Sequence, residues 1–316
     1  LDIYLPRWAR AEKRRRQNNT EKAMLIRQFR KIDSYSWIKL SLTAIAVVIA
    51  IGFARNQSPL EVVLFLVLFL VLGSLTNIMF RERWAYKSTN FRYFVFAVFT
   101  LLWSATHEGY ELLIWSFLLE IQWQFSENFR IKKNAVWLLN HASISALVLI
   151  FSSGNGYFFG ICSLLILLRI VTWRPLYVLQ WLIGFLFPLL IAYLLSTNGL
   201  MNITFEWVTD YPTNIHIWLP LGLLFILTLH QVVYSYRKAN QTNKRRSLLS
   251  LFLFLLGALG AWFGVGTMAT AIAMLGLSFQ VSNALYYSKP RWYIEGIALI
   301  IVIYSCLLLF GVTLPI

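Results

Sequence analysis

Apolar residues along this chain come in long runs, separated by short groups of charged and polar residues. Several runs reach the roughly 17–25 residues that a helix needs to cross a bilayer. We therefore predict an all-α, polytopic bundle of about eleven transmembrane helices (nine to eleven), forming one domain over residues 38–316 behind a basic segment at 1–37. The predicted spans are 38–53, 60–80, 93–105, 110–123, 136–152, 157–171, 176–196, 215–234, 248–264, 268–287 and 292–310.

Two of these spans, 93–105 and 110–123, are shorter than a full crossing. They fit either two complete crossings or one re-entrant pair. Both alternatives have the same parity, so the predicted side of the C-terminus does not depend on the choice.

Charge sets the predicted orientation. The chain carries 28 Lys and Arg against 13 Asp and Glu, a net charge of +15. In a soluble protein such an excess suggests nucleic acid as a partner. Here, however, 59% of the residues in the chain are hydrophobic, and the cytoplasmic loops of membrane proteins are enriched in Lys and Arg. With the N-terminus inside, only Arg55 lies outside, which leaves 27 of the 28 cations on the cytoplasmic side. We predict a multi-pass protein of the bacterial cytoplasmic (inner) membrane with its C-terminus outside, anionic lipid headgroups as partners and no nucleic acid.

The first 23 residues are basic and contain no apolar region typical of a signal peptide. They fit a cytoplasmic extension that lies on anionic lipid. They also fit an upstream read-through, with the natural start at Met24. Both alternatives stay open on the sequence.

Polar residues inside the spans are the first candidates for a functional site, because charged groups in a membrane are costly and default to functional hypotheses. Glu120 is the clearest case, and Arg169 or His141 is its expected ion-pair partner. Several such residues fall in the predicted inner half of the membrane and would form an inward-facing pocket: Glu120, Asn140, His141, Arg169, His230 and Gln280. The alternative is scattered polarity near the interface, where Asn, Gln and His are tolerated and Arg reaches water.

Basic residues at the inner span ends are the second set of candidates, for contact with anionic lipid or phosphate. They are Arg81, Arg83, Arg174, Arg245 and Arg246. On the outer side, His107, Glu108 and Glu111 are too few for a convergent metal site, so we predict neither a metal nor a cofactor.

Small residues are concentrated in the spans 248–264 and 268–287. Gly257, Gly260 and Gly264 are the expected packing positions, and the last two form a G-x-x-x-G pattern. In lipid, close backbone approach through small residues favours helix association. A tightly packed helical hairpin is the first interpretation, and a broken helix that lines a transport site is the second.

Three segments carry a resemblance to a known family. They are the run 140–147, the run 168–175 continuing through 182–188, and Lys-Pro-Arg-Trp at 289–292. Together they resemble an uncharacterised family of multi-pass inner-membrane proteins found in Bacteroidota. The resemblance covers the chain from about Met24 to the C-terminus and implies a compartment and an architecture, without an activity.

Three functions remain open on the sequence. No phosphate-binding loop, dinucleotide fingerprint, zinc motif or nucleophile elbow is present, which favours a non-enzymatic envelope component or a subunit bound to other envelope proteins. A glycosyltransferase or polymerase acting on polyprenyl-phosphate- or lipid-linked glycan is the alternative. It would have to engage phosphate from the inner face, near Arg169 and Arg174, because Arg55 is the only outer cation. The third is a transporter with the inward-facing polar pocket.

Overall fold

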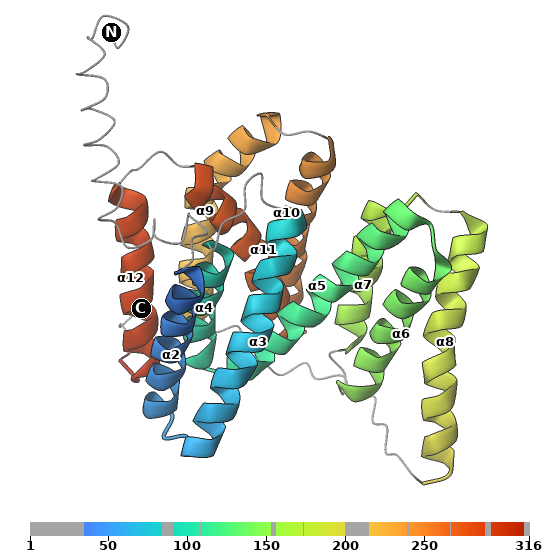
Figure 1. The fold of residues 1–316 in the computed structure, drawn as a ribbon, viewed down its shortest axis with the longest axis horizontal. Coiled ribbons are helices and arrows are strands. Elements are labelled where there is room, and N and C mark those ends of the chain that lie inside the picture. The colour runs from blue at the N-terminus through green and yellow to red at the C-terminus, as the bar shows by residue number, and fades with distance from the viewer. Residues whose placement is uncertain are drawn as a thin grey trace, which may run out of the picture.

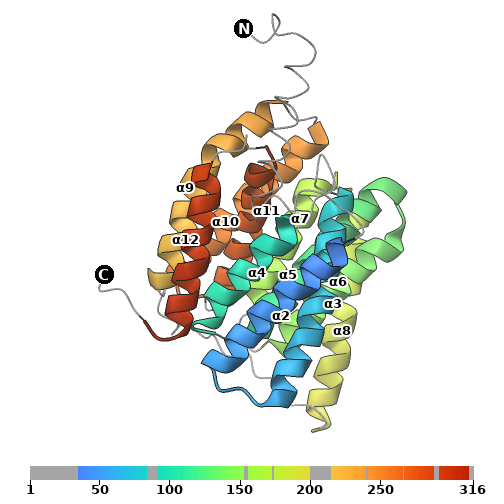
Figure 2. The same ribbon diagram turned by 60° about the vertical axis from the view of Figure 1, so that its left-hand side comes forward.

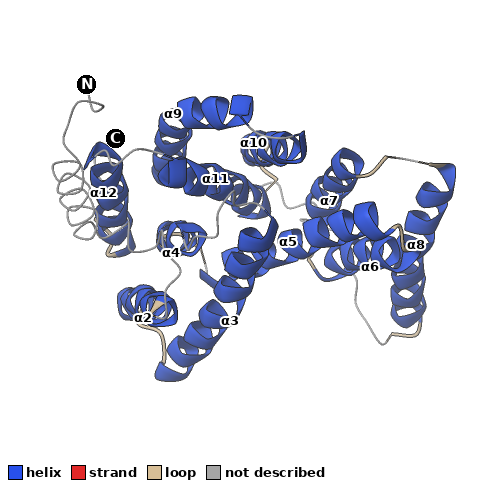
Figure 3. Cartoon of the chain, turned by 45° about the horizontal axis from the view of Figure 1, so that its top comes forward, coloured by secondary structure: helices blue, strands red, loops and turns tan. Residues whose placement is uncertain are grey.

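The computed structural model describes residues 35–83, 91–107, 109–152, 156–172, 174–199, 215–238, 241–265, 267–287 and 292–312. Within these ranges the chain forms eleven helices and no strand (Figure 1, Figure 3). The helices are α2 (Ser36–Ala54), α3 (Pro59–Arg83), α4 (Phe91–Ser104), α5 (Gly109–Lys132), α6 (Ala135–Phe151), α7 (Gly156–Ile170), α8 (Pro175–Thr197), α9 (Ile215–Lys238), α10 (Gln241–Trp262), α11 (Thr267–Tyr287) and α12 (Trp292–Leu309).

The predicted all-α class is confirmed, and each predicted span overlaps one of these helices. Five stretches of the described chain are long and apolar enough to cross a membrane. They are Ser36–Ala54, Pro59–Ile78, Pro175–Thr197, Lys244–Trp262 and Thr267–Leu285. These five agree with a membrane protein, while the number of crossings and the orientation stay predictions.

Two helices extend well beyond the predicted spans. Helix α5 continues nine residues past Trp123, and α10 begins seven residues before Leu248. The predicted boundaries stopped where charged and polar residues begin. In α5 these residues stay helical because Ser126, Glu127 and Asn128 are buried against neighbouring helices.

Several helix starts follow directly from the local sequence. The side-chain oxygen of Asn134 accepts a hydrogen bond from the Val136 backbone amide at 3.0 Å, which caps α6. At α3, Ser58 and Glu61 form reciprocal bonds between side chain and backbone, the arrangement of a capping box. Helix α8 begins with Pro175 in its first turn, where the missing amide proton costs nothing.

Helix α11 is the centre of the molecule, with 89% of its apolar stretch buried (Figure 2). It contributes to both apolar cores. One core includes residues of α2, α3, α4, α9 and α12, and the other includes residues of α5, α6, α7 and α10. Helix α8 lies at the edge of the second group, beside α6 (Figure 3), and only 11% of it is buried.

The hairpin of α10 and α11 is held by close backbone contact. A Cβ atom added at Gly257 would lie 2.4 Å from the backbone nitrogen of Ala273 on α11. One added at Gly260 would lie 2.5 Å from the ring of Phe158 on α7, so Gly260 packs α10 against a third helix. Gly264 has a different place from the one expected. It has a φ of +75° in the turn that ends α10, a conformation that favours glycine, so it shapes the turn.

Arg55, the one cation predicted on the outer side, is used to join helix ends. Its Nε donates to the backbone carbonyl of Ser104 at 2.8 Å. Arg55 follows α2 and Ser104 ends α4, so two helix ends predicted to share the outer side meet here.

Candidate functional site

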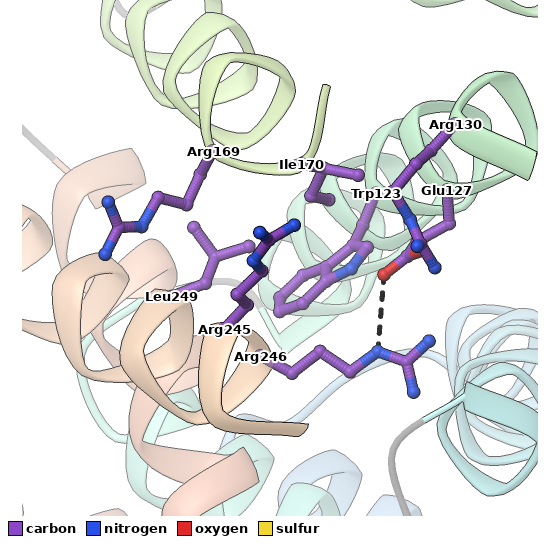
Figure 4. Close-up of a pocket in the computed structure, with 8 residues that line it drawn as sticks. All are labelled: Trp123, Glu127, Arg130, Arg169, Ile170, Arg245, Arg246 and Leu249. Carbon is purple, nitrogen blue, oxygen red and sulfur yellow. Dashed lines mark hydrogen bonds and ion pairs between the residues drawn. The ribbon is translucent and has the colours of Figure 1, made fainter. Parts of the chain in front are cut away.

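A basic pocket lies where the ends of α5, α7 and α10 meet, and its volume is about 150 Å³ (Figure 4). The sequence predicts all three of these ends on the cytoplasmic side. The pocket is lined by four arginines, one glutamate and three apolar residues: Arg130, Arg169, Arg245, Arg246, Glu127, Trp123, Ile170 and Leu249. We call it the arginine pocket.

Glu127 organises one side of the arginine pocket. It is buried, and its Oε2 accepts from Arg130 on the next turn of α5, with an ion-pair distance of 2.7 Å. Its Oε1 accepts from the Nε of Arg246 on α10 at 3.3 Å. One carboxylate therefore fixes two guanidinium groups from two different helices.

The other two arginines have no carboxylate partner within the described part of the chain. Arg169 is in the last turn of α7 and Arg245 is near the start of α10; both side chains are exposed. Figure 4 shows Arg245 beside the Trp123 ring, and Arg169 at the end of α7 on the far side of Leu249 from it. Four guanidinium groups and one carboxylate leave the arginine pocket with a net charge of +3.

Apolar side chains form the rest of the wall. Trp123 is buried, and its ring centroid is 5.4 Å from that of Phe279 on α11. Ile170 and Leu249 lie beside it in the lining. A ligand in the arginine pocket would therefore meet both guanidinium groups and apolar side chains.

Glu120, the leading sequence candidate, takes part in a different arrangement. Its Oε1 accepts from Arg92 on α4, and neither Arg169 nor His141 pairs with it as expected. The guanidinium carbon of Arg92 lies 4.1 Å from the centroid of the Phe279 ring. The pair is buried between α4, α5 and α11 and ties these helices together.

His141 lies in a buried polar network between α5, α6, α7 and α8. Its Nδ1 accepts from the indole of Trp181 at 3.3 Å, and its Nε2 lies 3.3 Å from Ser163 Oγ. Since an indole can only donate, Nδ1 carries no proton, and Nε2 donates to Ser163. Gln122 on α5 completes the network by donating to the His141 carbonyl at 2.9 Å. These bonds satisfy a neutral imidazole and cross-link four helices.

The expected inward-facing pocket is therefore not assembled. Glu120, His141 and Arg169 occupy three separate environments, and the side chains of Asn140 and His230 are exposed. Gln280 is buried, and its amide oxygen and nitrogen have no hydrogen-bond partner within the described residues.

The basic candidates are divided in a similar way. Arg245 and Arg246 come together in the arginine pocket, and Arg169 joins them. Arg174 is exposed outside the pocket, with its guanidinium carbon 6.0 Å from the Tyr177 ring centroid. The side chains of Arg81 and Arg83 lie outside the described part of the chain.

The sequence analysis missed Arg92, Glu127 and Arg130 as site residues. A signal was present along α5, where Glu120, Trp123 and Glu127 are spaced i, i+3 and i+7 and so share one helix face. The predicted span ended at Trp123, which placed Glu127 in a loop and concealed that spacing.

At the predicted outer end, His107 follows α4, and its ring centroid is 4.6 Å from that of Trp103. Partial burial lowers the pKa of His107; a bond with the Thr106 backbone raises it, and the nearby charge of Arg55 lowers it further. Glu108 lies outside the described residues. No group of three His, Cys, Asp or Glu in the described ranges could hold a metal ion.

The chain was compared with known protein families, with curated proteins and with solved structures, and none of them matches it. The resemblance to the family of inner-membrane proteins from Bacteroidota therefore stays a prediction. The function has to be argued from the site.

Proposed function

We propose that this protein is a non-enzymatic integral component of the bacterial cytoplasmic membrane that binds the phosphate of an anionic headgroup in its arginine pocket. The observation that carries this proposal is the pair Arg169 and Arg245. Both line the pocket, and neither has a carboxylate partner among the described residues.

The chemistry of arginine supports phosphate as the ligand. A guanidinium group is planar and offers a fork of donors that matches phosphate oxygens in bidentate geometry. Charge-assisted bonds of this kind are roughly twice as strong as neutral ones. The pocket is partly enclosed and has a net charge of +3, so its guanidinium groups repel one another. A bound anion would reduce this repulsion.

The position of the pocket supports a membrane lipid as the source. Five stretches are long and apolar enough to cross a bilayer, and the pocket lies at helix ends rich in arginine. By the distribution of Lys and Arg this is the cytoplasmic side. The cytoplasmic leaflet carries a negative surface potential from anionic lipids, worth about 1 kcal/mol per nearby basic residue.

Arg169 also keeps the second candidate function open, an enzyme that acts on a lipid-linked glycan. Such an enzyme would hold the lipid phosphate of its substrate in the same pocket. A general acid or base would then be needed beside it. Glu127 is the only carboxylate in the described lining, and two arginines hold it. Binding without chemistry is therefore the better supported proposal.

The transporter hypothesis loses its main support. It drew on a polar pocket around Glu120 and on the small residues of the spans 248–264 and 268–287. Glu120 and His141 instead make separate structural contacts, and His230 is exposed.

The test is native mass spectrometry of the purified protein from micelles that contain dioleoylphosphatidylglycerol and dioleoylphosphatidylcholine in equal amounts. We expect the Arg169→Gln/Arg245→Gln variant to retain at least about tenfold less phosphatidylglycerol than wild type, since bonds to a charged group contribute about 1.5–3 kcal/mol each.

Arg237→Gln is the control, because Arg237 is exposed at the end of α9, an end that is also predicted on the cytoplasmic side, and does not line the pocket. Phosphatidylglycerol retention should be unchanged in this variant. Equal retention by the double variant and wild type, or an equal loss in the control, would contradict the proposal.

A further inference from the structure

We infer that the arginine pocket selects a terminal phosphate, that is a phosphate monoester, over the phosphodiester of an ordinary phospholipid. This inference rests on the proposed function and specifies its ligand. The shared chemistry is a doubly charged phosphate group on an organic residue, whether a lipid or a soluble ester.

Charge balance is the first argument. The lining has a net charge of +3, because Glu127 offsets only one of four arginines. A phosphodiester carries one negative charge. A phosphate monoester carries about 1.5–2 negative charges at pH 7, since its second pKa is near 6. The monoester therefore offsets more of the excess charge in the pocket.

The number of hydrogen-bond acceptors is the second argument. Arg169 and Arg245 are on different helices, α7 and α10, and each can present a bidentate fork. A diester has only two non-bridging oxygens to share between the two forks. A monoester has three terminal oxygens, so it offers more acceptors to the two guanidinium groups.

Glu127 contributes as a positioning residue. By holding Arg130 and Arg246 on its side of the pocket, it leaves Arg169 and Arg245 as the pair that is available to the ligand. The asymmetry fixes where the phosphate lies, beside the two arginines without a carboxylate partner.

The apolar wall and the volume define the rest of the ligand. Trp123, Ile170 and Leu249 offer carbon surface to the organic residue next to the ester oxygen. A cavity needs a volume of about 10–15 Å³ to hold one water. The pocket of about 150 Å³ therefore holds a phosphate group and several waters.

The experiment compares dioleoylphosphatidic acid, a monoester, with dioleoylphosphatidylglycerol, a diester, at equal mole fraction in phosphatidylcholine nanodiscs that hold the full chain. Bound lipid is counted by native mass spectrometry. We expect wild type to prefer phosphatidic acid by about tenfold at pH 7.5. At pH 5 the preference should fall below about twofold, because the monoester loses its second charge while arginine stays protonated.

Two further arms locate the effect and the source of the phosphate. Arg169→Gln/Arg245→Gln should abolish the preference, and Arg237→Gln should keep it. Competition with glycerol 3-phosphate then separates the sources. Displacement of phosphatidic acid assigns the site to a soluble monoester, and retention assigns it to a lipid monoester.

The failures are distinguishable. If wild type binds both lipids equally, and the double variant loses both, the monoester inference is wrong and the proposed function stands. If the double variant binds both lipids as wild type does, the proposed function fails as well. A preference that does not change between pH 7.5 and pH 5 would also overturn the inference, and this readout needs no variant.

Discussion

Replacing Glu120 with glutamine keeps the size of the side chain and removes the charge that faces Arg92. The guanidinium of Arg92 is fully buried, and Glu120 is 5% exposed. After the change, Arg92 stays in the interior of the bundle without the carboxylate charge of Glu120. Breaking a buried ion pair in this way costs about 3–5 kcal/mol.

One contact in the structure places the expected cost near the lower end of that range. The Phe279 ring stays 4.1 Å from the Arg92 guanidinium carbon, and a desolvated cation–π contact is worth about 2 kcal/mol. We therefore expect Glu120→Gln to lower the free energy of unfolding by about 3 kcal/mol.

The assay is equilibrium unfolding in mixed micelles with increasing SDS, followed by the loss of helical structure. The double variant Arg92→Met/Glu120→Leu should recover most of the loss, because replacing a buried pair with apolar residues is often neutral or stabilising. Arg237→Gln is the control for loss of a charge, since Arg237 is exposed, and surface changes are usually within about 0.5 kcal/mol. A single variant as stable as wild type, or a double variant no better than the single, would refute the reasoning.

Two further predictions concern helix packing. Gly257→Ala should destabilise by about 1–3 kcal/mol, because the new Cβ would lie 2.4 Å from the backbone of α11, whereas Gly222→Ala should stabilise by about 0.4–1 kcal/mol, since nothing lies within 4 Å there. The same SDS titration checks both, and equal effects would contradict the packing account. Trp181→Phe removes the donor to buried His141 and should cost about 1–3 kcal/mol; Trp262→Phe, at a side chain that is 81% exposed, should change stability by less than about 0.5 kcal/mol.

The helices could be predicted because a membrane demands that each spanning segment satisfies its own backbone hydrogen bonds. A long apolar run such as that of α8 has few alternatives to a helix. The errors at α5 and α10 come from residues that are polar and buried. Glu127 and Asn128 read as a loop in the sequence, and only their contacts with other helices keep them inside the bundle.

The candidate site was predicted in part. Lys and Arg at the inner ends predicted anionic partners, and Arg245 and Arg246 do line the arginine pocket. Depth along a helix, however, does not define the direction in which a side chain points. Glu120 and Gln122 are two residues apart on α5. Glu120 contacts α4, and Gln122 contacts α6.

The sequence also could not predict which arginines have a carboxylate partner. Glu127 pairs with Arg246 across 119 positions of the chain, and the availability of Arg169 and Arg245 follows from that pairing. Arg92 lies just before the first residue of a predicted span, where an arginine normally reaches water. Its burial depends on the packing of α4 against α5 and α11.

The central claim is that Arg169 and Arg245 hold a phosphate group at the ends of α5, α7 and α10 that are predicted to be cytoplasmic. An electron cryo-microscopy structure of the full chain in nanodiscs that contain dioleoylphosphatidic acid tests it most directly. We predict phosphate density in the arginine pocket within hydrogen-bond distance of both guanidinium groups, with Glu127 still bound to Arg130 and Arg246. Lipid density around Arg174 with an empty arginine pocket, or Arg245 paired with a carboxylate, would contradict the account.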